Sequence, residues 1–551
     1  MAKKRRYFDD LPGVKSPRAN FDLSHRVATT MRPGLLHPID IVEVLPGDTW
    51  SVDSASLVKS AVPFVRPIMD DIFLDTYSFF VPLRLLVNDF EGVFGDSSPS
   101  AYDEPSFTSI PVFRMVGDET AGQNIAPANT VYDYLGALTD LVNLGSVQEI
   151  AAEYSVLPVR AFAFIWNEFF RNENIDQEVS INKATAVDAS ELPNNHDWSP
   201  TNYAGQLPPV RRYGDYFSTA MLAPQKGPSV KIPIEGTTLA VSKSVTPLGG
   251  NLKFLDSLAG NSGPLNVHTD GTVSIGSNPS WGNDSSVSRT NLVVGEPVDG
   301  TINALRTAFQ LQKYLERDAF YGSRYREYLY SAFGVVSEDS RVQVPEFLGG
   351  THNRLDIVQV MSTSATSTIA QGQFAGQLSC LSKKNLRFSK SVPEHGYIIT
   401  VACIRYKHLY SQSVQKLWFR KRREDFYDRL FSNLGQKAIK LNEVIGGIPS
   451  GNYPSILGYQ ENFAEYRTIL DRVTGQMRPD DGNLGQYWSL ADRFNEVPAL
   501  SDVVHEETDS FERVLSSLPA GEHPFVCDFN FRCSVARVVS PYSMPGFADH
   551  H

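Results

Sequence analysis

Alternation of hydrophobic and polar residues is clearest near the C-terminus. Within residues 525–539, every second side chain from Phe525 to Val535 is apolar, and the side chains between them are mostly polar. A period of two is typical of a β-strand with one buried face. Cys527 and Cys533 share the apolar face, but six residues of strand span roughly 20 Å, whereas a disulfide tolerates about 6 Å between Cα atoms. We therefore expect both to be core thiols.

Other segments have the composition of strands. Residues 39–45 end in the turn Pro46-Gly47-Asp48, residues 72–81 are rich in aromatic side chains, and residues 355–361 are shorter. The run at 396–405 is almost wholly apolar. It predicts a strand that is buried on both faces.

Segments of helical period lie between these strands. They are residues 131–144, 159–171, 302–320, 323–333 before Gly334, and 425–434 before Gly435. They do not alternate regularly with the strands, which argues against a doubly wound parallel sheet. The pattern favours an antiparallel β core with helices and long excursions between its strands.

The largest shift in composition falls on residues 246–300, where 27 of 55 residues are Gly, Ser, Asn or Pro. Short apolar runs at 273–275 and 292–294 predict small strands joined by turns. Long surface segments often carry contacts, although a tolerated insertion without a role has the same composition. We take residues 226–300 as a candidate surface insertion.

Residues 1–35 form a basic segment, with eight Lys or Arg against three Asp. Few apolar positions repeat and Pro and Gly are frequent, so we expect an extended or disordered arm. It is either a solvated terminus or an arm that binds nucleic acid or a partner.

The remaining composition describes a folded chain with a large core. The net charge of −12 argues against a surface devoted wholly to nucleic acid. Four scattered cysteines are too few for a disulfide framework, which suggests a reducing compartment. We expect neither an export signal nor a membrane span, because no apolar run approaches about 18 residues.

Local motifs for catalysis are lacking, and no phosphate loop, HExxH, GxSxG or Cys/His metal spacing occurs. His395 and His408 are expected to be hydrogen-bonded residues rather than catalysts. The acidic run at 502–512 suits a solvated polar face better than a cation site, and residues 480–483 suit a turn better than a calcium loop. No catalytic, cofactor or metal site is predicted.

A basic cluster stands at residues 405–423. It carries seven Lys or Arg and no acid, with Tyr406, Tyr410, Trp418 and Phe419 interleaved. Cations attract phosphates and exposed aromatic rings stack unpaired bases, so this composition suits a single-stranded nucleic-acid surface. Pairing with acids of a neighbouring subunit is the alternative, and the aromatic residues fit a core equally well.

Residues 302–350 closely resemble a segment of the major capsid proteins of gokushoviruses, small icosahedral single-stranded DNA phages of the Microviridae. Further similar segments follow in order along the chain. They read FDLSH at 21–25, EVLPGD at 43–48, FFVPLRLL at 79–86, IWNEFFR at 165–171, EHGYII at 394–399, LGYQENFAEYR at 457–467 and SPYSMPGFADH at 540–550. Their number, order and spacing make the resemblance specific.

The resemblance implies a structural protein without enzymatic activity. The implied fold is mainly β, a single eight-stranded antiparallel jelly roll with long, partly helical inter-strand insertions over residues 36–551. The implied assembly is a T=1 icosahedral shell around circular single-stranded DNA, assembled in the host cytoplasm, with residues 226–300 as a three-fold protrusion facing the host. The implied partners are other copies of the chain, the packaged DNA, a small basic DNA-binding viral protein, a minor or pilot capsid protein and a bacterial surface receptor.

For the genome we expect contacts with phosphates rather than with bases. The candidate residues are Lys3, Lys4, Arg5, Arg6, Arg420, Lys421, Arg422 and Arg423. We expect the N-terminal arm and the helices around 131–172 and 302–333 to be buried against other subunits. A β-rich carbohydrate-binding or carbohydrate-active protein is the alternative, and a secreted adhesin or lectin is a third possibility.

Overall fold

The computed structural model describes most of the chain. The described residues are 18–66, 68–94, 108–114, 127–137, 153–230, 240–241, 253–256, 262–264, 266–267, 273–274, 279–280, 292–293, 302–356, 358–361, 374–378, 380–381, 384–447, 455–480, 482–506, 509–515, 521–539 and 541. The chain divides into two compact units, one formed by residues 1–226 with 317–551 and the other by residues 227–316.

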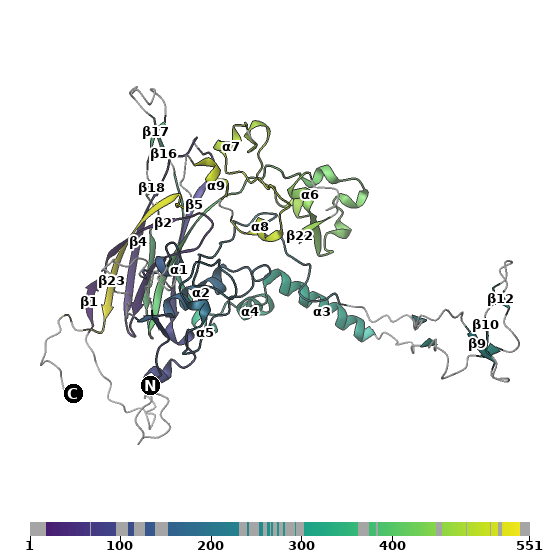
Figure 1. Ribbon diagram of the computed structural model, residues 1–551, viewed down its shortest axis with the longest axis horizontal. Coiled ribbons are helices and arrows are strands. Elements are labelled where there is room, and N and C mark those ends of the chain that lie inside the picture. Colours follow the sequence, from purple (N-terminus) through teal and green to yellow (C-terminus); the bar gives the residue numbers. More distant parts are fainter. Residues whose placement is uncertain are drawn as a thin grey trace, which may run out of the picture. The chain divides into compact units, whose positions relative to one another are not determined.

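The first unit is built on two antiparallel sheets (Figure 1). In sheet 1, β23 (Phe525–Arg537) pairs on one side with β1 (Ala19–Asp22) and β2 (His25–Met31) and on the other with β4 (Thr49–Ser60), which in turn pairs with β18 (Cys380–Leu381) and β19 (Leu386–Ser391). In sheet 2 the order is β15 (Glu346–Arg354), β5 (Ile72–Pro82), β20 (Gly396–Tyr406) and β3 (His37–Val44).

The two sheets share one hydrophobic core. Side chains of β23 and β4 from sheet 1 cluster there with side chains of β3, β5 and β20 from sheet 2. Burial along β23 alternates as its sequence does, with Phe525, Phe529 and Phe531 almost fully buried. The residues between them are exposed or partly exposed and mostly polar, as the period of two predicts.

The second face of sheet 2 is also covered, which explains why β20 is almost wholly apolar. Phe79 of β5 and Val401 of β20 belong to a second core that includes nearly all of α2 (Leu157–Ile165). A π-helical turn, Trp166–Phe170, continues α2, and α1 (Val131–Tyr134) packs in the same core. Because both faces are covered, few positions favour a polar side chain, and the polar Thr400 and Arg405 each have a hydrogen-bond partner on β5.

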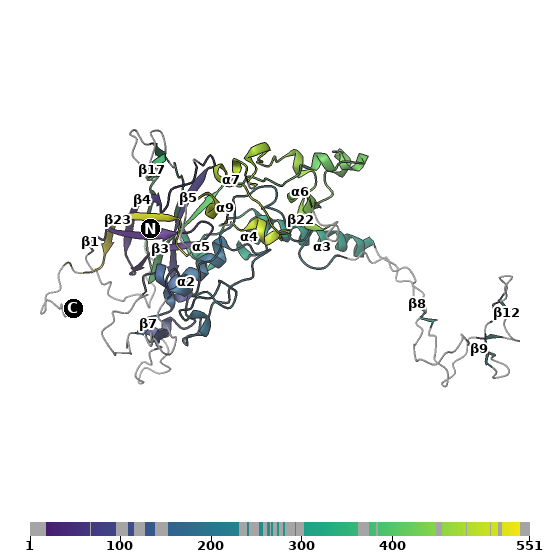
Figure 2. The same cartoon turned by 45° about the horizontal axis from the view of Figure 1, so that its top comes forward.

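A third, smaller core lies at the end of the unit opposite to β1 and β23 (Figures 1 and 2). Its side chains come from the antiparallel pair of β21 (Gln436–Lys440) and β22 (Ile456–Glu461), from α6 (Leu441–Val444) and α8 (Leu500–Val504), and from the segment around Phe217.

Shorter elements connect these parts. In the first unit they are β6 (Val112–Arg114), β7 (Glu153–Ser155), α4 (Tyr325–Phe333), α5 (Asp339–Val342), β16 (Val358–Met361), β17 (Phe374–Leu378), α7 (Gly485–Trp488) and α9 (Asp509–Val514). The second unit contains β8 (Ala240–Val241), β9 (Lys253–Asp256), β10 (Ser262–Pro264), β11 (Asn266–Val267), β12 (Val273–Ser274), β13 (Pro279–Ser280) and β14 (Leu292–Val293), and α3 (Ile302–Tyr321) runs across the boundary of the units.

Most of the predicted elements are confirmed, because their hydrophobic patterns are strong. They include β3, β5, β20, β23, α2 and α3, as well as α4, which ends at Gly334 in the left-handed region with φ 67°. Small strands occur where the Gly-rich segment predicts them, at β12 and β14. The cysteines of β23 are buried free thiols, as expected.

Three local predictions differ from the structure. The helix expected at 425–434 is wrong, because 3-10 turns at Arg423–Asp425 and Arg429–Phe431 replace it, and the Asp428 carboxylate accepts the Leu430 backbone N–H in a local turn. The strand expected at 355–361 is divided, since β15 ends at Arg354 and β16 begins at Val358. The helix expected at 131–144 is described only as far as 137, and α1 ends at Tyr134.

The basic arm expected over residues 1–35 is ordered as sheet from Ala19 onward, where β1 and β2 pair with β23. The prediction of an arm rested on the charge of this segment, but Phe21 of β1 and Val27 and Met31 of β2 also contribute apolar side chains to the core between the sheets. Residues 1–17 lie outside the described part of the chain.

Candidate nucleic-acid and assembly surfaces

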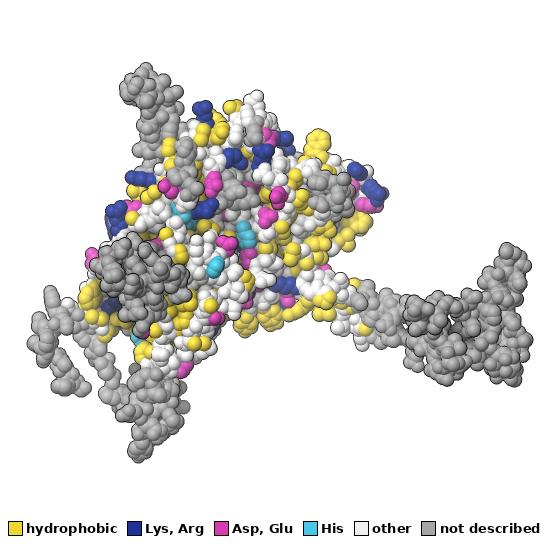
Figure 3. Space-filling view, in the orientation of Figure 1, with side chains coloured by type: hydrophobic (Ala, Val, Ile, Leu, Met, Phe, Trp, Pro, Cys, Tyr) yellow, Lys and Arg dark blue, Asp and Glu magenta, His cyan; other side chains and the backbone are white. Residues whose placement is uncertain are grey.

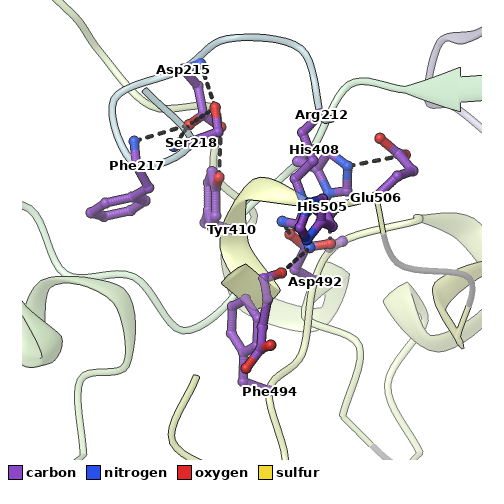
Figure 4. Close-up of polar contacts among 12 residues, drawn as sticks. Arg212, Asp215, Phe217, Ser218, His408, Tyr410, Asp492, Phe494, His505 and Glu506 are labelled. Atoms are coloured by element: carbon purple, nitrogen blue, oxygen red, sulfur yellow. Dashed lines mark hydrogen bonds and ion pairs between the residues drawn. The ribbon is translucent and has the colours of Figure 1, made fainter. Parts of the chain in front are cut away.

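A buried polar network holds the segment after β20 against the rest of the unit (Figure 4). Nδ1 of His408 lies 2.9 Å from the Asp492 carboxylate, and Nε2 of His408 lies 3.1 Å from Glu506. Arg212 donates to Asp492 at 2.6 Å. Burial alone lowers the pKa of His408, but attraction to Asp492 and Glu506 outweighs it and raises the pKa to about 9. His408 is therefore a hydrogen-bonded core residue, as predicted.

Arg405 is not part of an exposed basic surface. Its Nε donates to Asp75 at 2.9 Å, and its guanidinium lies over the ring of Tyr213 at 4.3 Å. Tyr406 and Tyr410 are buried in cores. The basic cluster expected over 405–423 is therefore shorter, because its first residues complete the end of β20.

Lys416 and Arg420 turn toward the third core. Both lie near Glu465, with nitrogen-to-oxygen distances of 3.7 and 3.6 Å. The guanidinium of Arg420 also lies 4.6 Å from the centre of the Tyr466 ring. Arg420, one of the predicted phosphate-binding residues, is thus half-buried and paired within its own subunit.

The next three residues, Lys421, Arg422 and Arg423, are exposed. The Asp425 carboxylate accepts the backbone N–H groups of Lys421 and Arg422 at 2.9 Å each, which fixes the turn. These two hydrogen bonds lower the pKa of Asp425. The turn thereby holds three adjacent cations on the surface.

Exposed aromatic side chains flank these cations in the sequence. Trp418, Phe426 and Tyr427 are 74%, 54% and 55% exposed. Over residues 416–440, eight Lys or Arg and three Asp or Glu give a net charge of +5 in a chain whose total is −12. Figure 3 shows basic and hydrophobic side chains next to each other in the part that carries α6 and β22. We call residues 416–440 the basic-aromatic segment. The remaining candidates, Lys3 to Arg6, lie outside the described residues.

A second exposed surface is apolar and lies on α4 and the residues after it. None of the α4 residues is buried. Tyr325, Phe333 and Val336 are 65%, 66% and 78% exposed. Exposed apolar side chains grouped in this way are typical of a protein–protein contact.

Within residues 131–172, where we expect a contact with other subunits, α2 is buried inside its own subunit. All of α2 except Pro158 is buried within this subunit. The Arg160 side chain at its centre is fully buried and pairs with Glu191 at 2.5 Å. The expected contact therefore does not involve α2, and for the rest of the region, which includes the exposed Gly136 and Glu153, it stays a prediction.

Comparison with known proteins decides the identity of the chain. A protein-family model described as "Capsid protein (F protein)" matches residues 9–547. Capsid protein VP1 of Bdellovibrio phage phiMH2K is 32% identical over 98% of this chain and 97% of that protein. Capsid protein VP1 of Chlamydia phage 1 and that of Spiroplasma virus 4 are each 30% identical over the same shares.

The chain belongs to this phage capsid protein family. The capsid protein is thus a structural component of a virion and not an enzyme, which confirms the resemblance to the gokushovirus proteins and sets aside the carbohydrate-active and adhesin alternatives.

The acidic segments of the capsid protein have local structural roles. Glu506, in the run at 502–512, is buried against His408. The turn predicted at 480–483 is confirmed by the hydrogen bond from the Asn483 N–H to the Asp480 carbonyl. Within the described ranges, no group of three or more His, Cys, Asp or Glu is placed to hold a metal. Among the same residues, every helix is too short or too polar to span a bilayer.

Sequence reasoning missed two features of the capsid protein. The Arg160–Glu191 pair gives no local signal, because an arginine inside an apolar helix finds its partner only in the fold. The sequence of β4 does carry a strand pattern, since Trp50, Val52 and Val58 alternate with polar residues. Its serines at 54 and 56 weaken the apolar pattern.

Proposed function

We propose that this capsid protein is an eight-stranded jelly-roll subunit that assembles into a T=1 icosahedral shell around circular single-stranded DNA. The strand order supports the jelly roll, and membership of the capsid protein family supports the assembly. We count β1 with β2 as one strand and β18 with β19 as another, which gives eight strands numbered in chain order. Sheet 1 then has the order first, eighth, third, sixth, and sheet 2 has the order second, seventh, fourth, fifth. Except for β5 and β15, consecutive strands alternate between the sheets, as in the double Greek key of a jelly roll.

Self-assembly is the role of the long connections. A closed shell needs several different complementary patches on each subunit, joined by heterologous contacts that close under rotation. The exposed apolar side chains of α4 supply one such patch. Many weak contacts of this kind give a stable particle through multivalency.

The DNA contact lies on the interior surface and is independent of sequence. The exposed cations Lys421, Arg422 and Arg423, with the aromatic side chains beside them, support this role for the basic-aromatic segment. The N-terminal residues Lys3, Lys4, Arg5 and Arg6 contribute further positive charge. A small basic DNA-binding viral protein neutralises the remaining phosphate charge, which suits a chain that is itself acidic.

Host contact belongs to the surface insertion at residues 226–300, as a protrusion at the three-fold axes. Its composition and the separate compact unit at 227–316 support this assignment. A bacterial surface receptor and a minor or pilot capsid protein complete the set of partners, and assembly takes place in the host cytoplasm.

Electron microscopy of the expressed chain tests the shell. We expect particles of uniform diameter whose icosahedral reconstruction contains one subunit per asymmetric unit. A different triangulation, or a chain that stays monomeric at high concentration, would contradict the proposal.

A salt titration of the unassembled subunit with a single-stranded oligonucleotide tests the DNA contact. Replacing Lys421, Arg422 and Arg423 by Gln should weaken binding and reduce the slope of log K against log salt by about 2, at roughly 0.7 per charge. A charge-matched control replaces the scattered exposed residues Arg26, Arg341 and Arg387 by Gln. An equal loss in the control would contradict the assignment.

A further inference from the structure

A pocket of about 300 Å³ opens beside the exposed cations of the basic-aromatic segment. Its walls are mostly apolar, and this volume is at the small end of the range for small-molecule sites. The lining includes Phe217, Leu417, Tyr466, Ile469 and Leu470. Such walls suit a flat or compact apolar group.

Charged side chains of both signs also line this pocket. Lys416 and Arg420 bring cations, and Glu443 and Glu465 bring carboxylates. The cations lie more than 3.5 Å from Glu465, so these are ion pairs without direct hydrogen bonds. A ligand that carries hydrogen-bond donors and acceptors close together on one edge matches this arrangement.

Two observations favour a nucleobase as that ligand. Tyr466 is 50% exposed, with the guanidinium of Arg420 against its ring, and this forms a stacking platform at the pocket. Arg420 is followed directly by the exposed Lys421, Arg422 and Arg423, which suit the phosphates on either side of an inserted base. A neutral sugar would gain nothing from these three cations.

We propose that this pocket takes one unpaired nucleobase of the packaged strand, while the adjacent cations hold the backbone. The inference rests on the proposed contact of the segment with DNA and makes it more specific. Base stacking tolerates any sequence, so the pocket remains compatible with the packaging of an arbitrary genome.

The test compares two oligonucleotides of equal length and charge, one with bases and one with abasic sites throughout. The unassembled subunit should bind the base-bearing strand at least about fivefold more tightly, because stacking of a single base on a protein ring is worth that much or more. Ile469→Asp should reduce this preference toward one, since it places a carboxylate on the pocket wall. Ile469 is 87% exposed, so folding does not depend on it.

Leu430→Asp is the matched control, because Leu430 is similarly exposed, at 84%, and lies in the basic-aromatic segment but does not line the pocket. It should leave the preference for the base-bearing strand unchanged. The Gln variant of Lys421, Arg422 and Arg423 should weaken the binding of both strands alike.

The outcomes separate the two proposals. Equal binding of the two strands by the wild-type subunit would overturn the base pocket while leaving the phosphate contact intact. No binding of either strand at low salt would overturn the DNA contact itself. Two further outcomes would also overturn the base pocket. If Ile469→Asp abolishes particle assembly but leaves the base preference unchanged, the pocket binds a neighbouring copy of the chain. If a neutral hexose competes for the pocket and a nucleoside does not, the pocket binds a sugar.

Discussion

Nδ1 of His408 lies 2.9 Å from both carboxylate oxygens of Asp492, inside the subunit, where neither side chain is exposed to water. The pair joins the segment after β20 to the loop before α8. Figure 4 shows this contact. The basic-aromatic segment begins eight residues after His408, at Lys416, so the contact anchors the chain just before that segment.

Stability of the subunit should depend on the charge of His408. The pKa of His408 is raised from 6.5 to about 9 on folding, so its stabilisation is complete below pH 6.5 and is lost as pH rises through 9. His408→Gln should lower the free energy of unfolding at pH 6 by about 3–5 kcal/mol and remove this alkaline loss. Urea unfolding at pH 6 and pH 9 measures both effects. His196→Gln, at an exposed histidine, is the control, and an unchanged pH profile in His408→Gln would contradict the assignment.

The fully buried pair of Arg160 and Glu191 should be costly to break. Arg160→Met leaves the Glu191 carboxylate in the core without its cation, and we expect a loss of about 3–5 kcal/mol in unfolding free energy. The double variant with Glu191→Met should recover much of that loss. Arg341→Met removes a pair with Glu338 whose side chains are 80% and 79% exposed, and it should change stability by less than about 1 kcal/mol. Similar losses in both single variants would refute this reading.

Two strand glycines should respond differently to a methyl group. A Cβ at Gly396 of β20 would lie 2.6 Å from the Val81 carbonyl oxygen and would also meet the Phe80 ring. Gly396→Ala should therefore destabilise the subunit by about 1–3 kcal/mol or more, seen as a lower Tm. At Gly349 of β15 the nearest atom would be 3.5 Å away, so Gly349→Ala should be nearly neutral. Equal Tm values for the two variants would show that the space around Gly396 can adjust.

The apolar surface on α4 should matter for assembly and not for folding. Phe333 is 66% exposed in the subunit, so Phe333→Asp should leave Tm within about 2 °C of the wild type. We expect the same variant to abolish or strongly reduce particle formation, measured by sedimentation. Met69→Asp, at a residue that is 71% exposed outside this surface, is the matched control. Normal particle yield from Phe333→Asp would exclude α4 as a contact.

The sequence determined the elements with strong periodicity and the identity of the family. β23 and β20 could be predicted because each side chain reports the environment of its own strand face, and α4 because Gly334 marks its end. The similar segments along the chain likewise needed no coordinates. These signals are local, so they survive without any knowledge of the fold.

Only the tertiary structure decided which charged residues are available on the surface. Arg405 and Lys421 look alike in the sequence, yet Arg405 is held by Asp75, 330 residues away, while Lys421 is exposed. The tertiary structure also decided what covers α2, because the apolar sequence of this helix does not tell whether its own subunit or a neighbour buries it. Charge and hydrophobicity set what a side chain requires, but the partner that meets the requirement is brought near by the fold alone.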